Sequence, residues 1–85
     1  MRLILIVSGE DISVQTTHWE SLANLRDFAL TATHNTGRPL DDWDIRDTRG
    51  VWQHPNATVE NSYLRDGDRL FVTLRVGVGG AALAA

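Results

Sequence analysis

Two short runs at the beginning of the chain have a period of two residues. In the first run Leu3, Leu5 and Val7 alternate with Arg2, Ile4, Ile6 and Ser8, and after a break that contains Gly9 the positions Ile12, Val14 and Thr16 alternate again. A period of two residues is typical of a β-strand with one buried face, and glycine permits the tight turn that joins two such strands. The pattern therefore predicts a β-hairpin at the start of the chain.

The pattern then changes to the spacing of an amphipathic helix, from about residue 20 to residue 36. Ser21 or Thr17 can cap the start of this helix, whereas Gly37 and Pro39 are typical of the chain just after a helix end. The apolar positions that recur at helical spacing, and so share one face, are Leu22, Leu25, Phe28, Ala29 and Ala32.

The rest of the chain predicts a second short hairpin, a loop and a final strand. The hairpin strands are expected at Trp43 to Asp47 and Val51 to Gln53, because Asp47 to Gly50 has the composition of a turn. His54 to Asn56 is expected to be a loop because it contains proline, and Arg69 to Val76 is the last strand. In this strand Leu70, Val72, Leu74 and Val76 are expected to face the core, and Phe71, Thr73 and Arg75 the opposite side.

Strand, strand, helix, strand, short strand, loop and strand is the order of an α+β domain with the β-grasp arrangement. In that arrangement the first and last strands lie parallel at the centre of a mixed sheet of four to five strands, and the helix packs on one face. A chain of 85 residues allows one domain with a modest core. We expect the domain to span residues 1–76, with a tail at 77–80 and an extension at 81–85.

Composition excludes several classes of function. The chain has no cysteine, so it has no disulfide, thiolate metal site or nucleophilic thiol, and we expect a cytoplasmic protein. Its net charge is −3 and its eight basic residues are scattered arginines, which does not favour nucleic acid as a partner. The apolar run from Leu3 to Val7 is too short to span a membrane or to form a signal-peptide core, so no membrane partner is expected.

No set of side chains has the spacing of a catalytic or metal site. His18, His34 and His54 are expected at a strand end, a helix end and a loop, which is not a metal-ligand spacing. The acidic residues between 41 and 47 lack the EF-hand pattern and are interpreted as a solvated face. We therefore expect a protein that is not an enzyme and that binds no metal or cofactor. The three tryptophans, interpreted as core or half-buried sheet residues, are Trp19, Trp43 and Trp52.

The tail expected after the last strand contains Gly79-Gly80, and Ala81 to Ala85 follow it. Neither glycine has a Cβ, so the backbone can lie extended in a slot too narrow for a side chain, and a nucleophile can reach the Gly80 carbonyl. A double glycine here is what a chain needs if its own C-terminus is to become a reactive acyl group. The tail therefore indicates a protein that is handled by enzymes.

The β-grasp order followed by an extended Gly-Gly tail resembles ubiquitin. In the last third of the chain the resemblance extends to single residues, and Leu74-Arg75-Val76 resembles the Leu-Arg-Leu entrance to the ubiquitin tail. Among bacterial proteins, the combination resembles the ubiquitin-like modifiers of ubiquitination-like (Bub or Bil type) antiviral operons. The resemblance to ubiquitin also includes its core: residues at the same mutual spacings as core positions of ubiquitin are Thr58-Val59, Leu64 and Leu70-Phe71-Val72.

This resemblance implies the precursor of a protein modifier. A processing and deconjugating protease would cut between Gly80 and Ala81. An ATP-dependent E1-like activating enzyme would then activate the Gly80 carboxylate, and an E2-like enzyme would pass it to target proteins. Gly79, Gly80 and Ala81 would form the cleavage and conjugation site. The enzymes would recognise the tail, as it enters them, through Arg75, Val76, Gly77 and Val78.

The exposed apolar patch of ubiquitin would be replaced here by a surface centred on Arg46, Phe71 and Thr73. The resemblance therefore implies that these residues are the partner surface and that generic ubiquitin receptors do not bind it. An exposed aromatic side chain on a central strand is costly to leave in water and is a common binding anchor. In the alternative interpretation, Phe71 lies beneath the side chain of Trp43 or Trp52.

Two other functions fit the same features. A sulfur carrier of the thiamin or molybdopterin type has the same fold and tail, and its Leu-x-x-Gly-Asp turn is similar to Leu64 to Asp68 here. Such carriers normally end at Gly-Gly, so Ala81 to Ala85 favour the modifier unless these residues are an artificial addition. A noncovalent β-grasp adaptor would use the domain alone and leave the glycines as a loose end.

Overall fold

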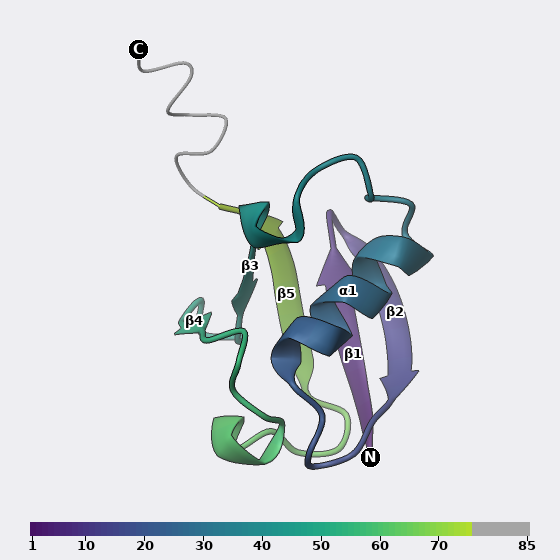
Figure 1. Cartoon of the computed structure of the whole chain (residues 1–85). Helices are drawn as coiled ribbons and strands as arrows, with labels where there is room; N and C mark the ends of the chain where they lie inside the picture. The colour runs from purple at the N-terminus through teal and green to yellow at the C-terminus, as the bar shows by residue number, and fades with distance from the viewer. Residues whose placement is uncertain (76–85) are drawn as a thin grey trace.

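The computed structural model describes residues 1–75, which form one mixed sheet and one α-helix (Figure 1). The predictions for residues 76–85, which contain the tail and the extension, lie outside the described residues. The predicted order of hairpin, helix, hairpin, loop and last strand is confirmed. The strands are β1 (Arg2–Val7), β2 (Glu10–Gln15), β3 (Trp43–Arg46), β4 (Trp52–Gln53) and β5 (Arg69–Leu74); the helix is α1 (Leu22–Ala32), and Leu40–Asp42 and Glu60–Ser62 form 3₁₀ turns.

The sheet has the strand order β2-β1-β5-β3-β4, so the first and last strands of the chain are neighbours at its centre. β1 and β5 run parallel, with Leu5 opposite Leu70, whereas all the other strand pairs run antiparallel. α1 lies across one face of the sheet (Figure 1). This is the β-grasp arrangement, and the predicted fold class is confirmed.

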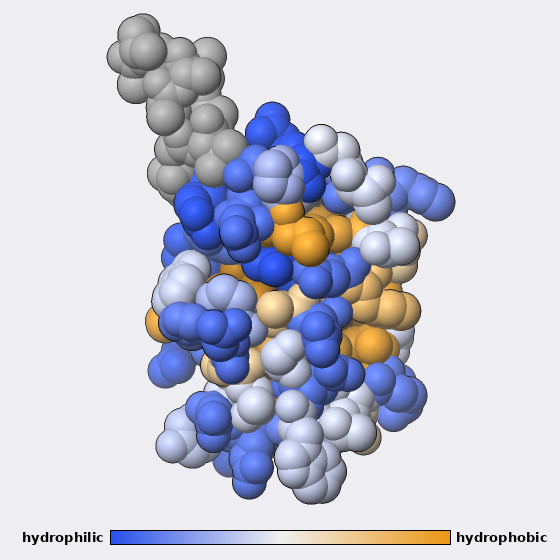
Figure 2. Space-filling view, in the orientation of Figure 1, coloured by the Kyte–Doolittle hydropathy of each residue, from blue (hydrophilic) through white to orange (hydrophobic). Residues whose placement is uncertain are grey.

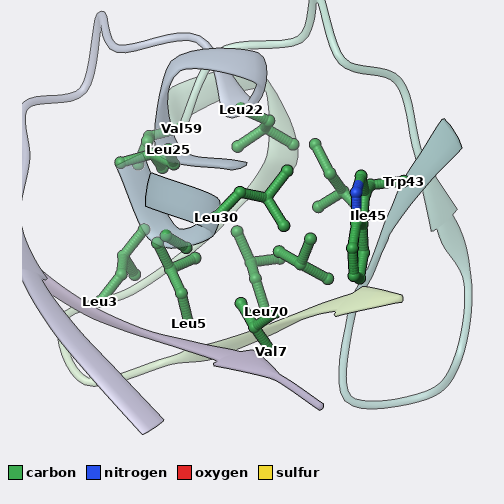
Figure 3. Packing of buried hydrophobic residues seen from close by; sticks show 12 residues of the cluster. Leu3, Leu5, Val7, Leu22, Leu25, Leu30, Trp43, Ile45, Val59 and Leu70 are labelled. Atoms are coloured by element: carbon green, nitrogen blue, oxygen red, sulfur yellow. The ribbon is translucent and has the colours of Figure 1, made fainter. Parts of the chain in front are cut away.

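The core lies between α1 and the sheet (Figure 3). Leu5 and Leu70, which pair across the two central strands, have no exposed surface, and Leu30 of α1 extends toward them from the helix. A fully buried side chain of this size contributes about 1.5–3 kcal/mol to folding. Within residues 1–75, the buried apolar cluster consists of Leu3, Leu5, Val7, Leu22, Leu25, Ala29, Leu30, Trp43, Ile45, Val59, Leu70 and Val72.

The turn between β1 and β2 sets which side chains of the first hairpin reach the core. Ser8 and Gly9 both have positive φ, 51° and 83°. Two successive residues of this kind form a turn whose twist matches that of the flanking strands. β2 begins at Glu10, directly after the turn, and Val7 pairs with Glu10. A shift of one residue would move every apolar side chain of the strand to the other face.

α1 begins as predicted but turns a different face to the core. The Ser21 hydroxyl accepts a hydrogen bond of 3.1 Å from the Asn24 N–H, so the predicted cap is confirmed. Phe28, expected on the buried face, is 48% exposed. The buried positions follow the spacing i, i+3, i+4, i+7, i+8, which places Arg26 rather than Phe28 on the core side. They are Leu22, Leu25, Arg26, Ala29 and Leu30.

α1 ends at Ala32, earlier than the predicted end near residue 36, and Gly37 is not the residue that stops it. His34 adopts the left-handed conformation that glycine usually occupies after a helix, with a φ of 61°. The Asn35 N–H then turns back to donate to the Leu30 carbonyl at 2.8 Å. The early end was not predicted because glycine is the usual residue at this position, and the first glycine after the helix is Gly37.

Leu74 of β5 was expected in the core but is 44% exposed. It pairs with Trp43 of β3, and both side chains line a depression of about 300 Å³ that His34 also borders. His34 lies two residues after Ala32, the last residue of α1, so the depression beside Leu74 is bordered by the chain that follows the helix.

The surface that carries α1 has apolar areas interrupted by charged and other polar side chains (Figure 2). Phe28 and Leu40 are among the exposed apolar residues in the described part of the chain.

Within residues 1–75, no helix has both the length and the apolar character that are needed to cross a membrane.

Candidate functional site

The face of the sheet opposite α1 brings together the three residues that were expected to form a partner surface. Arg46 of β3 is the cross-strand partner of Phe71 in β5, and Thr73 follows on the same face of β5. Arg46 and Phe71 are half-buried, and Thr73 is exposed. Their neighbours Leu70 and Val72 point into the core, because side chains alternate along a strand. The role of the three residues in binding a partner stays a prediction.

Two further side chains extend this surface along one row of cross-strand partners. Ile6 of β1 lies opposite Phe71, and Trp52 of β4 lies opposite Arg46. Ile6 is half-buried and Trp52 is 46% exposed. We refer to Ile6, Phe71, Arg46 and Trp52 as the open-face row. The sequence does contain a signal for Ile6. If the second face of β1 were solvated, a polar residue would be expected at this position, and Ile6 is apolar.

The interpretation in which Trp43 covers Phe71 is wrong. Trp43 is 6% exposed and lies in the core on the α1 side of the sheet (Figure 3), whereas Phe71 lies on the opposite face. Trp52 does share the open face, but Arg46 stands between it and Phe71 in the row. Phe71 is therefore a half-buried aromatic side chain at the centre of the open face.

Phe71→Ala is expected to weaken binding of a protein partner at least about tenfold, because aromatic anchors dominate such interfaces. It should lower the free energy of unfolding by only about 1–2 kcal/mol, since Phe71 is half-buried. Calorimetric titration with the partner and thermal unfolding measure the two effects. Phe28→Ala removes the other phenylalanine, which lies on α1, and is the matched control with unchanged binding. Severe unfolding of Phe71→Ala with undiminished partner affinity would assign Phe71 to the fold instead.

Asp44 is a buried carboxylate on the open face. The acidic residues between 41 and 47 were interpreted as a solvated face, but Asp44 is only 6% exposed, so that interpretation is wrong for this residue. Its Oδ1 accepts hydrogen bonds from Trp52 Nε1 at 3.3 Å and from Arg75 Nε at 3.2 Å. Its Oδ2 lies 3.6 Å from Arg46 Nη2. A carboxylate that is removed from water needs such donors. The sequence could not show that three donor side chains would converge on Asp44.

Arg75 is the last described residue, two positions before the tail predicted at 77–80. Its backbone N–H donates to the Asp42 carbonyl at 2.7 Å, and its side chain donates to Asp44. Both contacts tie the end of β5 to the neighbouring β3 and the turn before it. The other residues predicted for tail recognition, cleavage and conjugation lie outside the described residues, and they are Val76, Gly77, Val78, Gly79, Gly80 and Ala81.

Asp47 organises the turn between β3 and β4. The Val51 and Arg49 N–H groups donate to Asp47 Oδ1 at 3.0 Å and 2.8 Å, and Arg49 Nη2 donates to Oδ2 at 3.2 Å. The hydrogen bond from Val51, with those from Arg49 in addition, holds the pKa of the Asp47 carboxyl below its usual 3.8. The predicted turn is therefore closed by a side chain as well as by the backbone.

Because the folded-state pKa of Asp47 is lowered, its ionised form stabilises the folded protein above pH 3.8. This contribution is lost as the pH falls through the folded-state pKa. The difference in thermal midpoint between the native protein and Asp47→Asn should therefore be constant near neutral pH and shrink below pH 3.8. Asp11→Asn, which removes an exposed carboxylate, controls for the change in net charge. A difference between native protein and Asp47→Asn that stays constant down to pH 2 would contradict this cause.

The three histidines do not form a site. His18 lies in the connection between β2 and α1, His34 directly after α1, and His54 in the loop after β4, where its Nδ1 accepts a hydrogen bond of 3.0 Å from the backbone of Asn56. In residues 1–75, no group of three or more His, Asp or Glu side chains could hold a metal ion.

Trp19 is 78% exposed, so its interpretation as a core or half-buried sheet residue is wrong.

A protein-family comparison covers most of the chain. Residues 1–80, which include Gly79-Gly80, match the family described as "Protein of Unknown function (DUF2604)". A curated relative, "Uncharacterized protein y4jI" of Sinorhizobium fredii, is 26% identical over 81 residues. The match covers 95% of this chain and 62% of that protein, so the chain spans about three-fifths of the length of the curated relative.

Comparison with solved structures agrees with the topology. "Caldiarchaeum Subterraneum Ubiquitin" matches with a TM-score of 0.74 over 89% of this chain and 94% of that chain. The sequence identity is 15%, so this likeness shows the fold alone. The described domain therefore has a ubiquitin-like fold.

Proposed function

The chain belongs to the family described as "Protein of Unknown function (DUF2604)" and has a ubiquitin-like fold, and on this premise we propose that it is the precursor of a ubiquitin-like protein modifier. A protease cuts the chain after Gly80. An E1-like enzyme activates the new carboxylate with ATP, and an E2-like enzyme transfers it to target proteins. The chain itself is the substrate of these reactions and supplies no catalytic group.

The observation that carries the proposal is the position of the last strand. β5 is held on both sides by β1 and β3, and the chain continues from it through Arg75 to Gly79-Gly80. The five residues that follow Arg75, up to Gly80, can span at most about 18 Å when extended. This length can carry the Gly80 carboxylate off the domain and into the active site of a partner. The family match also extends as far as Gly80.

The open face supports the part of the proposal that concerns recognition of the folded domain. Phe71 and Trp52 place two aromatic side chains in one row, with Arg46 between them. Tryptophan, tyrosine and arginine are the residue types most often found at binding hot spots, and aromatic residues in general are enriched at interfaces. An enzyme that binds this row can hold the domain while the tail enters its active site.

Co-expression of the full chain with the enzymes encoded beside its gene tests the proposal. Intact mass spectrometry should show loss of Ala81 to Ala85, together with heavier species joined to the chain through Gly80. A variant that ends at Gly80 is the control, since it should form the same species without the protease. Absence of any Gly80-linked species from both the full chain and this variant would contradict the proposal.

The same experiment separates the two alternatives. A sulfur carrier would acquire sulfur in place of an oxygen of the Gly80 carboxylate and would form no lasting link to other proteins. A noncovalent adaptor would keep Ala81 to Ala85 and would co-purify with a partner without any change in mass. The ubiquitin-like fold is common to all three functions, so the mass of the C-terminus decides between them.

We further propose that conjugation takes place in the cytoplasm of a bacterium as part of antiviral defence. This proposal is based on the resemblance to the modifiers of Bub or Bil type operons. The curated relative from a bacterium, Sinorhizobium fredii, is consistent with it. Cells that carry the gene with its neighbours should plate phage less efficiently than cells in which the codons for Gly79-Gly80 are deleted. Equal plating by both strains would contradict a defence role while leaving conjugation itself intact.

A further inference from the structure

We propose that Asp44 is the positioning residue for the tail, because its buried carboxylate holds the Arg75 guanidinium and thereby fixes the direction in which the chain leaves the sheet. The functional part of this inference rests on the proposed function, since the direction of the tail matters only if enzymes receive it. The structural part is a property of the isolated protein and can be tested on it.

The Asp44 carboxylate can act as a fixed point because it is itself held in place. Its side chain is 7% exposed, and Trp52 Nε1 donates to Oδ1 at 3.3 Å. A buried carboxylate is stable only with donors around it, so Asp44 cannot turn away from them at low cost. The Arg75 Nε that binds the same oxygen, at 3.2 Å, is therefore attached to a part of the structure that does not move freely.

Arg75 is joined to β3 by both its backbone and its side chain. The N–H bond of 2.7 Å to the Asp42 carbonyl continues the ladder between β5 and β3 one residue beyond Leu74. A single backbone hydrogen bond at the end of a strand is prone to fraying. The second contact, from Nε to Asp44, holds the chain to β3 as far as Arg75 rather than only as far as an earlier residue of β5.

Arg46 is a second arginine on the same carboxylate, and it comes from β3 rather than from the end of β5. Its Nη2 lies 3.6 Å from Asp44 Oδ2, and its Nη1 donates to the Gly50 carbonyl at 2.9 Å. Arg46 therefore links Asp44 to the turn between β3 and β4. Among the described residues, Asp44 provides the side-chain partner of the Arg75 guanidinium.

Amide hydrogen exchange in Asp44→Asn, measured by NMR on the isolated protein, tests the structural part. Asparagine keeps the size of the side chain and can still accept from Trp52, but it loses the charge that holds Arg75. The Arg75 amide should exchange about fivefold faster or more, as expected for loss of a charge-assisted bond at a half-exposed arginine. The amides of Leu70 and Val72, in the middle of the same strand, should change less than about twofold.

A double-mutant cycle shows whether Asp44 acts through Arg75. In an Arg75→Ala background, Asp44→Asn should have no further effect on the amide at position 75, because the side chain it would release is already gone. Arg49→Ala removes an arginine that pairs with Asp47 rather than with Asp44, so it is the matched control and should leave the Arg75 exchange within about twofold of the native value. The indole N–H resonance of Trp52 reports in each variant that the site around position 44 remains folded.

The functional part is tested with the activating enzyme. Asp44→Asn should raise KM for the protein about fivefold and leave kcat unchanged, because the Gly80 carboxylate is not altered. An unchanged Arg75 exchange in Asp44→Asn, or an equal rise at Leu70 and Arg75, overturns the inference whatever the conjugation assay shows. Faster exchange at Arg75 alone, with no conjugation by any variant, supports the role of Asp44 and contradicts the proposed function.

Discussion

Deletion of Gly79-Gly80 is expected to abolish conjugation completely, so that no linked species is detected by mass spectrometry or immunoblot. The deletion places Ala81 directly after Val78, and side chains with a Cβ then occupy a slot that only glycine fits. It also shortens the reach from Arg75 by about 7 Å, which withdraws the carbonyl from the active site. Because the deleted residues follow β5, the thermal midpoint should stay unchanged.

Deletion of Ala84-Ala85 is the matched control for this experiment. It removes the same number of residues from the same end of the chain and leaves both glycines in place, so processing and conjugation should continue. Conjugates that persist after deletion of Gly79-Gly80, with a junction mapped elsewhere on the chain, would show that the diglycine is not the reactive end.

Leu70→Ala is expected to lower the free energy of unfolding by about 2–5 kcal/mol. Leu70 has no exposed surface, lies in the central strand β5 and pairs with Leu5 of β1, so few neighbours can move to fill the space. A domain of this size has a total stability of about 4–11 kcal/mol. The substitution therefore removes a large share of it, and the thermal midpoint should fall by at least about 8 °C.

Thr73→Ala is the control for Leu70→Ala, because it changes the same strand on the opposite face. Thr73 is exposed, so its substitution should change the free energy of unfolding by no more than about 0.5 kcal/mol. Urea denaturation of the two variants and the native protein measures both effects. Equal losses from the two substitutions would show that β5 does not separate a buried face from an open one.

The periodicity of the chain was sufficient to predict the elements and their order. In β5, alternation with a period of two identified the core residues Leu70 and Val72, which are both buried, although Leu74 on the same predicted face is 44% exposed. This succeeded because burial on one face of a strand demands apolar residues at every second position. The chemistry of caps and turns is equally local: it predicted Ser21 or Thr17 as the helix cap, of which Ser21 is the residue found, and it predicted the turn that Asp47 closes.

The candidate site was predicted in part. Spacing placed Phe71 and Thr73 on one face of β5, and the resemblance to ubiquitin added Arg46 from another strand. Ile6 and Trp52 complete the row only because β1, β5, β3 and β4 lie side by side in that order. Such neighbours depend on the pairing of strands far apart in the chain, and a pattern within one strand carries no record of its partners.

The sequence by itself determined the order of the strands and the helix, the buried face of β5 as far as Val72, and that Gly79-Gly80 follows the last strand. The tertiary structure decided that Asp44, which reads as one of several solvated acidic residues, is buried beneath donors from Trp52, Arg46 and Arg75. The physical reason is that periodicity reports the burial of apolar side chains through local geometry. The burial of a charge depends on whether distant residues bring donors to it, which only the folded chain can arrange.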